Sequence, residues 1–446
     1  MTKQRKHHTW WRVFLILLFL APLGILFFLP DVPVHIGGTW FWLALLVCLW
    51  ILLTVMGMPE AATAGSEPPA LRMLHEDEQP EPVKEVMNVR VATEEPSGIR
   101  IFRGRLRESA AVVYEKLKLS ASDKSVPMIQ EDEELGASIL LLPKPVEKAT
   151  LEHPVRPWVN WLLFGLTLMT TTWAGAAHQG INLLREPGRF SAGLPYSLGL
   201  LAILGVHELG HYFTARSRGI QVTPPYFIPV PFALGTFGAF IQMRSPSENR
   251  RALFDVAIAG PLAGLVVAIP ALVIGLRSSA ILPGNPATDA GLMGGTSVGS
   301  SLLFALLAKL SLGDALQYGH VVRLSPLAFA GWLGLFVTAL NLLPIGQLDG
   351  GHIAHALFGR RIGETIGTVA MWSLLLLAIV VWPGLTFWAV IVFFIAGATT
   401  PPLNDVTPLT AGRRWLGYAS FVILGLILAP LPHSLWTAAG IHCPYM

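Results

Sequence analysis

Charged residues are scarce in this chain of 446 residues. Asp, Glu, Lys and Arg together make up 13% of it, whereas hydrophobic residues make up 53%. A typical soluble domain has about 25% charged residues, so the composition excludes an ordinary soluble protein. The net charge of +3 is small and dispersed, which argues against nucleic-acid binding.

Cysteine is rarer still. The chain has two cysteines, Cys48 inside an apolar run and Cys443 near the C-terminus. They make neither a CxxC metal-binding pattern nor a disulfide framework. Cysteine usage therefore gives no indication of the redox compartment.

Apolar runs of about 20 residues, the length that crosses a bilayer, are what the chain has in abundance. They predict an all-α polytopic membrane protein with about eight or nine transmembrane helices. Because the eighth run is short, eight and nine crossings both stay open. The runs lie at about residues 12–29, 40–56, 158–177, 194–213, 254–276, 327–343, 365–381, 385–395 and 416–431.

The basic residues predict the orientation. Lys3, Arg5 and Lys6 precede the first run, which is typical either of a signal peptide or of a retained helix with a cytoplasmic N-terminus. We favour the retained helix, because a second run follows quickly and no small-residue cleavage site stands out. Arginines after the fourth run give the same orientation, so residues 59–157 are predicted to be cytoplasmic and the protein to lie in the cell (inner) membrane.

Residues 59–157 differ in composition from the rest of the chain. Residues 59–96 are rich in Pro and Glu and are typical of a linker, whereas 99–142 predict a small α+β soluble domain with the order β-α-β-β. Four parts follow: two N-terminal transmembrane helices (1–58), the linker with its domain (59–157), a transmembrane core (158–362) and C-terminal transmembrane helices (363–446).

Two histidines and a glutamate interrupt the fourth apolar run. On a helix, His207 and His211 are one turn apart on one face, so both imidazoles can bind one metal ion, with Glu208 close enough to act as a general base. Hydrogen-bonded core histidines are the simpler alternative. Leaving three such groups unpaired in an apolar helix costs several kcal/mol, which favours the metal site.

A catalytic zinc ion usually has three protein ligands and keeps one position for water. Asp349 is the best candidate for the third ligand, because it follows the sixth run beyond Pro344 and has glycines on both sides. A cap or turn residue is the alternative for Asp349. The sequence thus predicts one zinc ion (Zn2+), with Glu208 taking a proton from the bound water.

Residues 221–243 hold four prolines followed by a glycine-rich stretch, and are neither a regular helix nor a soluble loop. Irregular backbone at membrane depth needs cover from protein or a water-filled cavity, so we expect a re-entrant loop or a short edge strand beside the metal helix. Asn341, three residues before Pro344, either satisfies carbonyls freed at a kink or binds substrate.

Together these motifs resemble the site-2 protease family of intramembrane zinc metalloproteases, in the plastid and bacterial branch with a soluble N-terminal domain. No stretch has the length and pattern of a PDZ domain. Four motifs occur in the family's order: His207–His211, Gly235–Ala239, Phe254–Pro261 and Asn341–Gly350.

The resemblance implies that His207, His211 and Asp349 bind zinc and that Glu208 is the catalytic base. It also implies that the stretch with Gly235, Thr236, Phe237 and Gly238 pairs with an extended substrate, and Asn341 is a further candidate for holding it. Strand pairing would replace the backbone hydrogen bonds that a transmembrane helix loses on unwinding.

The predicted function is therefore cleavage of transmembrane segments of other membrane proteins within the lipid bilayer, with no nucleic acid involved. Two alternatives use the same residues. Buried His, Glu and Asp side chains also mark the pathways of ion or metal transporters and channels. An inactive scaffold that binds transmembrane segments is the second alternative, although the intact Glu208 argues against it.

Overall fold

The computed structural model divides the chain into two compact units, Met1–Ala70 with Pro231–Ala233 and Leu71–Val230 with Leu234–Met446. All elements described below belong to the second unit. The structure describes residues 71–120, 125–132, 134–143, 157–231, 233–283, 301–315, 320–380, 389, 392–393, 397 and 400–429. The predicted segments at 12–29 and 40–56 lie outside the described residues, as does most of 385–395.

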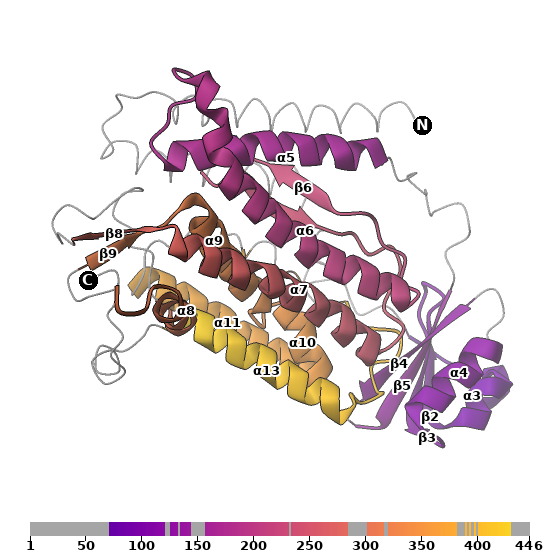
Figure 1. Cartoon of the computed structure of the whole chain (residues 1–446). Coiled ribbons are helices and arrows are strands. Elements are labelled where there is room, and N and C mark those ends of the chain that lie inside the picture. Colours follow the sequence, from indigo (N-terminus) through magenta and orange to yellow (C-terminus); the bar gives the residue numbers. More distant parts are fainter. Residues whose placement is uncertain are drawn as a thin grey trace. The chain divides into compact units, whose positions relative to one another are not determined.

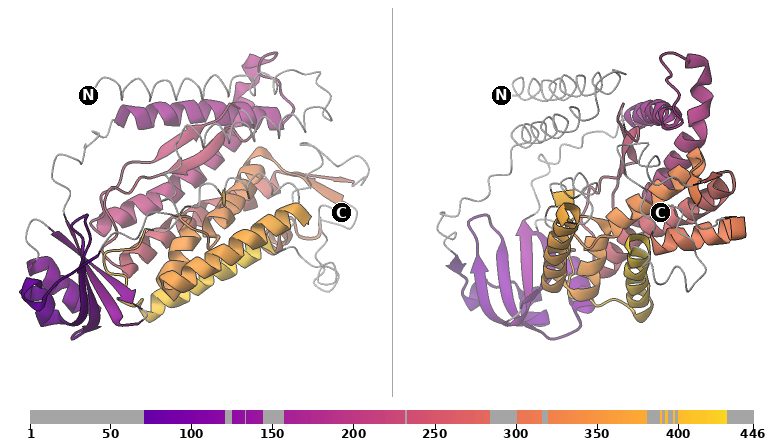
Figure 2. Two further views of the ribbon diagram at one scale, coloured as in Figure 1. Left: turned by 180° about the vertical axis from the view of Figure 1, so that it is seen from behind. Right: turned by 90° about the vertical axis from the view of Figure 1, so that its left-hand side faces the viewer.

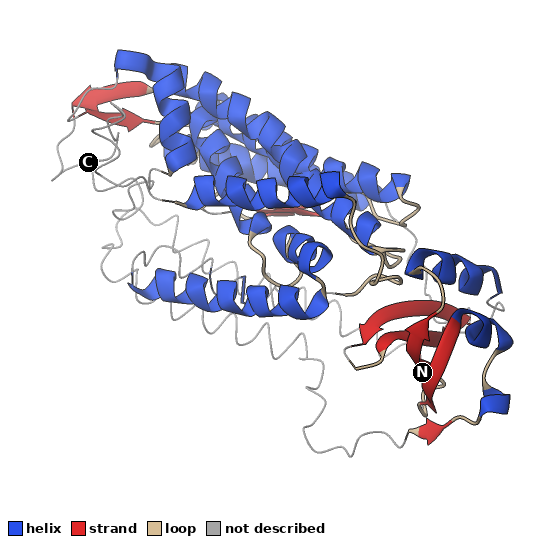
Figure 3. Ribbon diagram, turned by 90° about the horizontal axis from the view of Figure 1, so that it is seen from below, coloured by secondary structure: helices blue, strands red, loops and turns tan. Residues whose placement is uncertain are grey.

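Helices make up most of the described chain, and the strands form three separate sheets (Figure 3). The largest sheet has five antiparallel strands in the order β1-β2-β3-β5-β4. Helices α3 (Glu81–Val86) and α4 (Ala110–Ser120) contribute to one buried cluster with these strands. The strands are β1 (Arg72–Met73), β2 (Met87–Glu94), β3 (Arg100–Leu106), β4 (Ser125–Asp132) and β5 (Gly136–Pro143).

The α+β core follows from alternation along the strands, because successive side chains point to opposite faces of a sheet. Phe102, Ile129 and Ile139 are paired neighbours on β3, β4 and β5, and all three are fully buried. Val113 and Leu117, which are four residues apart on α4, cover them. The strand, helix and two strands predicted over 99–142 lie here as β3, α4, β4 and β5.

The linker predicted over 59–96 is wrong for its second half. β1, α3 and β2 occupy Arg72–Glu94, and β2 lies between β1 and β3 inside the sheet. Composition misled the prediction, because the prolines serve as helix-start residues: Pro80 is the N-cap of α3 and Pro82 lies in its first turn. The apolar residues between the glutamates, Val83, Val86 and Met87, are buried.

Long helices dominate the rest of the unit. Three of the described helices are long and apolar enough to cross a membrane: the stretch Pro187–Ser217, α7 and α13. The described part thus gives three candidate spans, short of the eight or nine predicted for the whole chain. The helices are α5 (Pro157–His178), α6 (Leu194–Ser217, preceded by the short helix η2, Pro187–Gly193), α7 (Arg250–Arg277), α8 (Leu302–Leu312), α9 (Pro326–Leu342), α10 (Asp349–Phe358), α11 (Arg360–Val380) and α13 (Ala411–Leu428).

α6, α7 and α9 pack side by side at the centre of this helical region (Figures 1 and 2). Glycines permit the close approach, as small residues do between membrane helices generally. A Cβ added to Gly210 of α6 would lie 2.6 Å from the Ala259 carbonyl oxygen of α7. A Cβ added to Gly331 of α9 would lie 2.5 Å from the Leu272 backbone nitrogen of α7.

The proline-rich stretch after α6 forms a β-hairpin. β6 (Tyr226–Pro229) pairs with β7 (Thr236–Phe240) in an antiparallel two-stranded sheet with one irregularity. β6 packs on α5 and β7 contacts α6. A second antiparallel pair, β8 (Ala280–Pro283) with β9 (His320–Arg323), was not predicted from the sequence; α8 lies between the two strands in the chain.

α10 is the element that matters most for the site and that the sequence did not predict. α9 ends at Leu342, a short turn contains Pro344, and α10 then begins at Asp349. Six residues therefore separate one apolar helix from the next, so a residue that follows α9 is carried on the first turn of a new helix.

Candidate metal centre

α6 presents three buried polar side chains at its middle. His207, Glu208 and His211 are 4%, 7% and 7% exposed. The Nε2 atoms of the two histidines lie 3.1 Å apart, as the spacing of one helical turn predicts. The structure thus brings together the pair that the sequence places on one face.

Asp349 completes the cluster from another part of the chain. Its Oδ2 atom lies 3.4 Å from His207 Nε2 and 3.3 Å from His211 Nε2. Within the described residues these three form a group that could hold a metal ion.

The glycines after Asp349 make room for this approach. A Cβ on Gly350 would lie 1.9 Å from the Leu342 carbonyl oxygen, and one on Gly351 would lie 2.1 Å from the Gly346 carbonyl oxygen. Any larger residue would push the start of α10 away from the end of α9. The glycines are therefore needed for close packing, as the sequence predicted.

The backbone of α7 fixes the protonation of His211. Its Nδ1 atom lies 2.8 Å from the Val256 carbonyl oxygen, which can only accept a hydrogen bond. Nδ1 therefore carries the proton, and the Nε2 atom of the neutral ring directs its lone pair at Asp349. Such a carbonyl contact is the usual way in which a metal-binding histidine is oriented.

The donor atoms fit a tetrahedral zinc ion. Two ligand atoms on such an ion, each about 2.0–2.1 Å from it, are separated by roughly 3.3 Å. The separations here are 3.1, 3.3 and 3.4 Å. Two imidazole nitrogens and a carboxylate oxygen that converge in a buried place repel one another unless a cation or a shared proton lies between them, so the arrangement suits a bound metal.

Glycines of α7 lie close to the two rings. A Cβ added to Gly260 would lie 2.0 Å from His211 Nε2, and one on Gly264 would lie 3.2 Å from His207 Nδ1. Gly260 and Gly264 of α7 thus lie directly against the imidazoles.

Glu208 connects the cluster to the hairpin. Its carboxylate lies near the backbone of Ile241, the residue that follows β7. Phe237 and Phe240 of β7 are about half exposed, at 48% and 47%. Among the described residues β7 pairs only with β6, so its other edge is unpaired next to the general-base candidate.

The four predicted substrate-binding residues of the hairpin differ in their surroundings. Gly235 and Gly238 have φ of +81° and +106°, which favours glycine. The Thr236 hydroxyl donates to the Ile228 carbonyl and accepts from the Gly238 N–H, so it holds the hairpin together. Phe237 is the one whose side chain is exposed.

Asn341 reaches the cluster from α9. Its amide nitrogen lies 3.3 Å from His207 Nε2. The sequence allowed two roles for Asn341, in a helix kink or in substrate binding. The structure places it at the edge of the metal cluster.

Sequence reasoning missed His352. It lies three residues after Asp349 on α10, is 8% exposed, and its Nδ1 atom has no hydrogen-bond partner among the described residues. The spacing of three residues would have put it on the same face as Asp349 had a helix been expected there.

Comparison with protein families matches residues 195–381 to Peptidase family M50. The probable zinc metalloprotease EGY1, chloroplastic, of Arabidopsis thaliana is 31% identical over 391 residues, covering 79% of this chain and 70% of that relative. The chain belongs to peptidase family M50. The predicted resemblance to the site-2 proteases is thereby confirmed.

Other relatives have similar names. The probable zinc metalloprotease EGY2, chloroplastic, of Oryza sativa subsp. indica is 32% identical over 355 residues, and the protein of that name from Arabidopsis thaliana is 31% identical over 359. These alignments cover 77% and 76% of this chain, but 63% and 61% of the relatives. No solved structure matches the chain.

The relatives also correct the predicted location. We expected the cell (inner) membrane from the basic N-terminus, and this prediction is wrong: the relatives are named chloroplastic, which points to a plastid membrane. The physical reason is that charge around apolar helices orients them in a bilayer without identifying which bilayer it is.

Proposed function

We propose that this M50 member is a zinc-dependent intramembrane endopeptidase that cleaves transmembrane segments of other membrane proteins. One observation carries the proposal. Three donor atoms spaced for zinc lie beside Glu208, and two of them are on a stretch long and apolar enough to cross a membrane. The names of the relatives, probable zinc metalloproteases, support the same activity.

His207, His211 and Asp349 would hold the zinc ion, which when bound supplies a Lewis acid and lowers the pKa of a bound water. The remaining roles fall to the chain itself. Glu208 is close enough to take the proton of that water and deliver it to the leaving amine. Val256 keeps the proton of His211 on Nδ1, away from the donor atom.

The hairpin is proposed to hold the substrate. A transmembrane helix uses its carbonyls in its own hydrogen bonds, so it has to be unwound locally before cleavage. The unpaired edge of β7 offers main-chain donors and acceptors to such a segment, with Gly235, Thr236 and Gly238 setting the strand's shape and Phe237 contacting side chains. Asn341 is proposed to bind the unwound segment from the opposite side of the cluster.

We propose eight or nine crossings for the whole chain, divided into the parts 1–58, 59–157, 158–362 and 363–446. Support comes from the helices α5, α6, α7, α9, α11 and α13, which lie where apolar segments were predicted. The other predicted segments, at 12–29, 40–56 and most of 385–395, lie outside the described residues.

The replacement Glu208→Gln tests the chemistry. The amide keeps the shape but cannot take a proton, so cleavage of a model transmembrane substrate by the purified protein should fall by about 10²- to 10⁴-fold, the usual contribution of a general base. Zinc content, measured by elemental analysis, should stay at the wild-type level. Cleavage at the wild-type rate would refute the mechanism.

The transporter alternative has no support from the comparisons, since the chain belongs to a peptidase family. It predicts zinc flux into liposomes that contain the purified protein. Zinc flux without cleavage of any transmembrane substrate would favour the transporter over the peptidase.

A further inference from the structure

The segment Leu403–Thr407 has neither helix nor strand of its own, yet its backbone is bonded on two sides. On one side Ile129 of β4 donates its N–H to the Leu403 carbonyl at 2.7 Å and accepts from the Asp405 N–H at 2.9 Å. On the other side Asn404 accepts from the Arg250 N–H at 3.2 Å and donates to the Glu248 carbonyl at 2.9 Å. The 403–407 segment therefore lies between the α+β sheet and the start of α7.

Side chains of the segment contact the sheet domain as well. Leu403 and Val406 pack against the buried cluster of that domain. The Asn404 amide donates to the Ala110 carbonyl at the first residue of α4. The segment thus has contacts with the sheet domain and α7 through four consecutive residues, 403–406.

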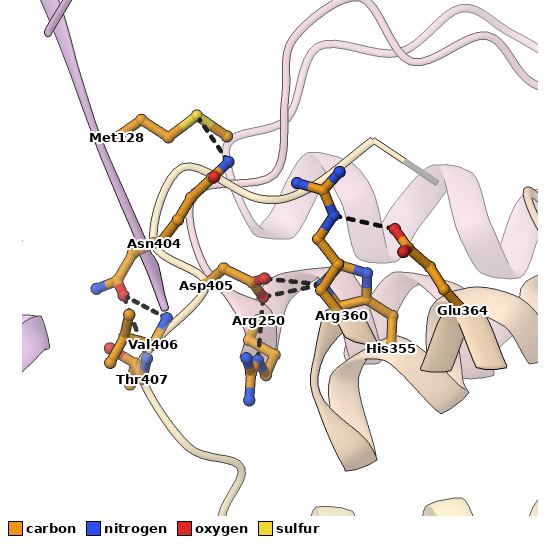
Figure 4. A network of polar contacts seen from close by, with 10 residues as sticks. Met128, Arg250, His355, Arg360, Glu364, Asn404, Asp405, Val406 and Thr407 are labelled. Carbon is orange, nitrogen blue, oxygen red and sulfur yellow. Dashed lines mark hydrogen bonds and ion pairs between the residues drawn. The ribbon is translucent and has the colours of Figure 1, made fainter. Parts of the chain in front are cut away.

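Asp405 ties this segment to α10 (Figure 4). The side chain is almost completely buried, and its carboxylate lies 2.9 and 3.0 Å from His355 Nε2. One of its oxygens also accepts from Arg250 Nε at 3.1 Å. His355 is in the last turn of α10, and Arg250 is the first residue of α7.

Both helices that Asp405 holds reach the metal cluster. α10 begins with Asp349, which is six residues, or about 9 Å of helix, before His355. α7 carries Val256, which orients His211, and Gly260, which lies against the same ring. A shift between α7 and α10 at the Asp405 end would therefore displace Asp349 from the two histidines.

We infer that Asp405 is a positioning residue for the metal centre: through Arg250 and His355 it sets α10 relative to α7, and the 403–407 segment joins that arrangement to the α+β sheet. Neither Asp405 nor His355 touches the donor atoms, so their effect is exerted through the helices. A short charged hydrogen bond in a buried place resists such a shift more strongly than apolar packing, because loss of one partner leaves a charge without compensation.

This inference rests on the proposed zinc site, and its test uses the affinity for zinc alone, measured in purified protein by competition with a chelator. Asp405→Asn keeps the shape and removes the charge. We expect the dissociation constant for zinc to rise 10- to 100-fold, the range known for partners that orient metal ligands. The value of kcat at saturating zinc should fall while KM for a transmembrane substrate stays within about twofold.

The matched control is Asp132→Asn. Asp132 also faces an arginine, Arg103 at 3.7 Å, and belongs to β4, but its partner lies on the sheet. Zinc affinity of this variant should equal that of the wild type. A general loss of folding would instead lower the melting temperature of both variants.

A second pair of variants covers the case in which Asp405→Asn does not fold. His355→Gln places an amide N–H near the position of the imidazole Nε2, so this variant should retain near wild-type zinc affinity. His355→Leu cannot donate and should bind zinc 10-fold or more weakly.

The outcomes separate the two proposals. Wild-type zinc affinity in folded Asp405→Asn and His355→Leu would overturn the positioning role and leave the proposed function intact. Absence of zinc binding in the wild type would instead overturn the proposed function.

Discussion

The His211 side chain shows how much of the site is decided within one residue. Its Nδ1–H is used by the Val256 carbonyl, and its Nε2 faces a carboxylate oxygen at 3.3 Å. The ring therefore has one tautomer and one orientation before any metal binds. Histidines that are fixed in this way lose little freedom on ligation, which favours tight binding.

Gly260→Ala is expected to damage the metal centre. Alanine is normally the better helix former by about 1 kcal/mol, so a loss cannot come from helix propensity. The added Cβ would lie 2.0 Å from His211 Nε2 and would displace the ring. Chelator competition should show zinc affinity at least tenfold weaker than in the wild type.

Gly264→Ala is the comparison for this variant. Its Cβ would lie 3.2 Å from His207 Nδ1, a contact that a small shift relieves. We expect a smaller loss of zinc affinity than for Gly260→Ala. An equal effect of the two substitutions, or none from Gly260→Ala, would show that the ring is not confined by α7.

The residues of the site were predictable to different degrees. His207, Glu208 and His211 lie on one helix, and periodicity alone brings them together. Asp349 lies beyond the end of α9, after a break in the helix that Pro344 and the glycines signalled. Asp405 gave no signal, because its partners Arg250 and His355 are 155 and 50 residues away in sequence and only the folded chain brings them into contact.

At the scale of elements, the β6–β7 hairpin lies between two helices and against Glu208. Thr170 of α5 donates its hydroxyl to the Gly235 carbonyl at 2.7 Å, and the Tyr196 hydroxyl of α6 donates to the Leu234 carbonyl at 2.9 Å. Two helices thus hold the turn by side-chain hydrogen bonds. The position of β7 relative to the metal cluster follows from these anchors.

Gly235→Ala is expected to weaken substrate binding without affecting zinc. A left-handed conformation costs a non-glycine residue roughly 1–2 kcal/mol, and the Cβ would lie 2.5 Å from Thr171 Cα. The hairpin must therefore move off α5. We expect KM for a transmembrane substrate to rise by about tenfold, equivalent to about 1.4 kcal/mol, with unchanged zinc content.

Gly165→Ala on α5 is the control, since nothing lies within 4 Å of a Cβ added there. Its KM and zinc content should match the wild type. A wild-type KM for Gly235→Ala would remove the hairpin from the substrate site.

Elements with a clear hydrophobic periodicity were predicted from the sequence, and elements without one were not. α6, α7 and α9 are continuous apolar helices, and the sequence places them within a few residues. α10 was missed because it is only ten residues long and has two glycines in its first turn, where glycine usually indicates a turn. Packing against α7 and α11 stabilises it instead.

At the scale of the whole molecule, the metal centre joins helices that are distant in sequence. Its ligands come from α6 and α10, and its support comes from α7 and α9. A bound ion links these helices directly. Ligand binding to the folded state alone stabilises it by about 2.7 kcal/mol at 100 times the dissociation constant.

Removal of zinc should therefore lower the apparent melting temperature of the purified protein by a few degrees, and added zinc should restore it. Differential scanning fluorimetry with and without a chelator measures the shift. Asp349→Ala should melt at the same temperature under both conditions. A zinc-dependent shift that persists in this variant would exclude Asp349 as a ligand.

The hydrogen bonds of the 403–407 segment also determine when the metal centre is completed during protein synthesis. A ribosome releases His207 and Glu208 first, Asp349 much later, and Asp405 after that. Until Asp405 emerges, α10 lacks its hold on Arg250. We therefore expect the nascent chain to bind zinc more weakly and to cleave more slowly than the finished chain, which limits cleavage of neighbouring proteins during synthesis.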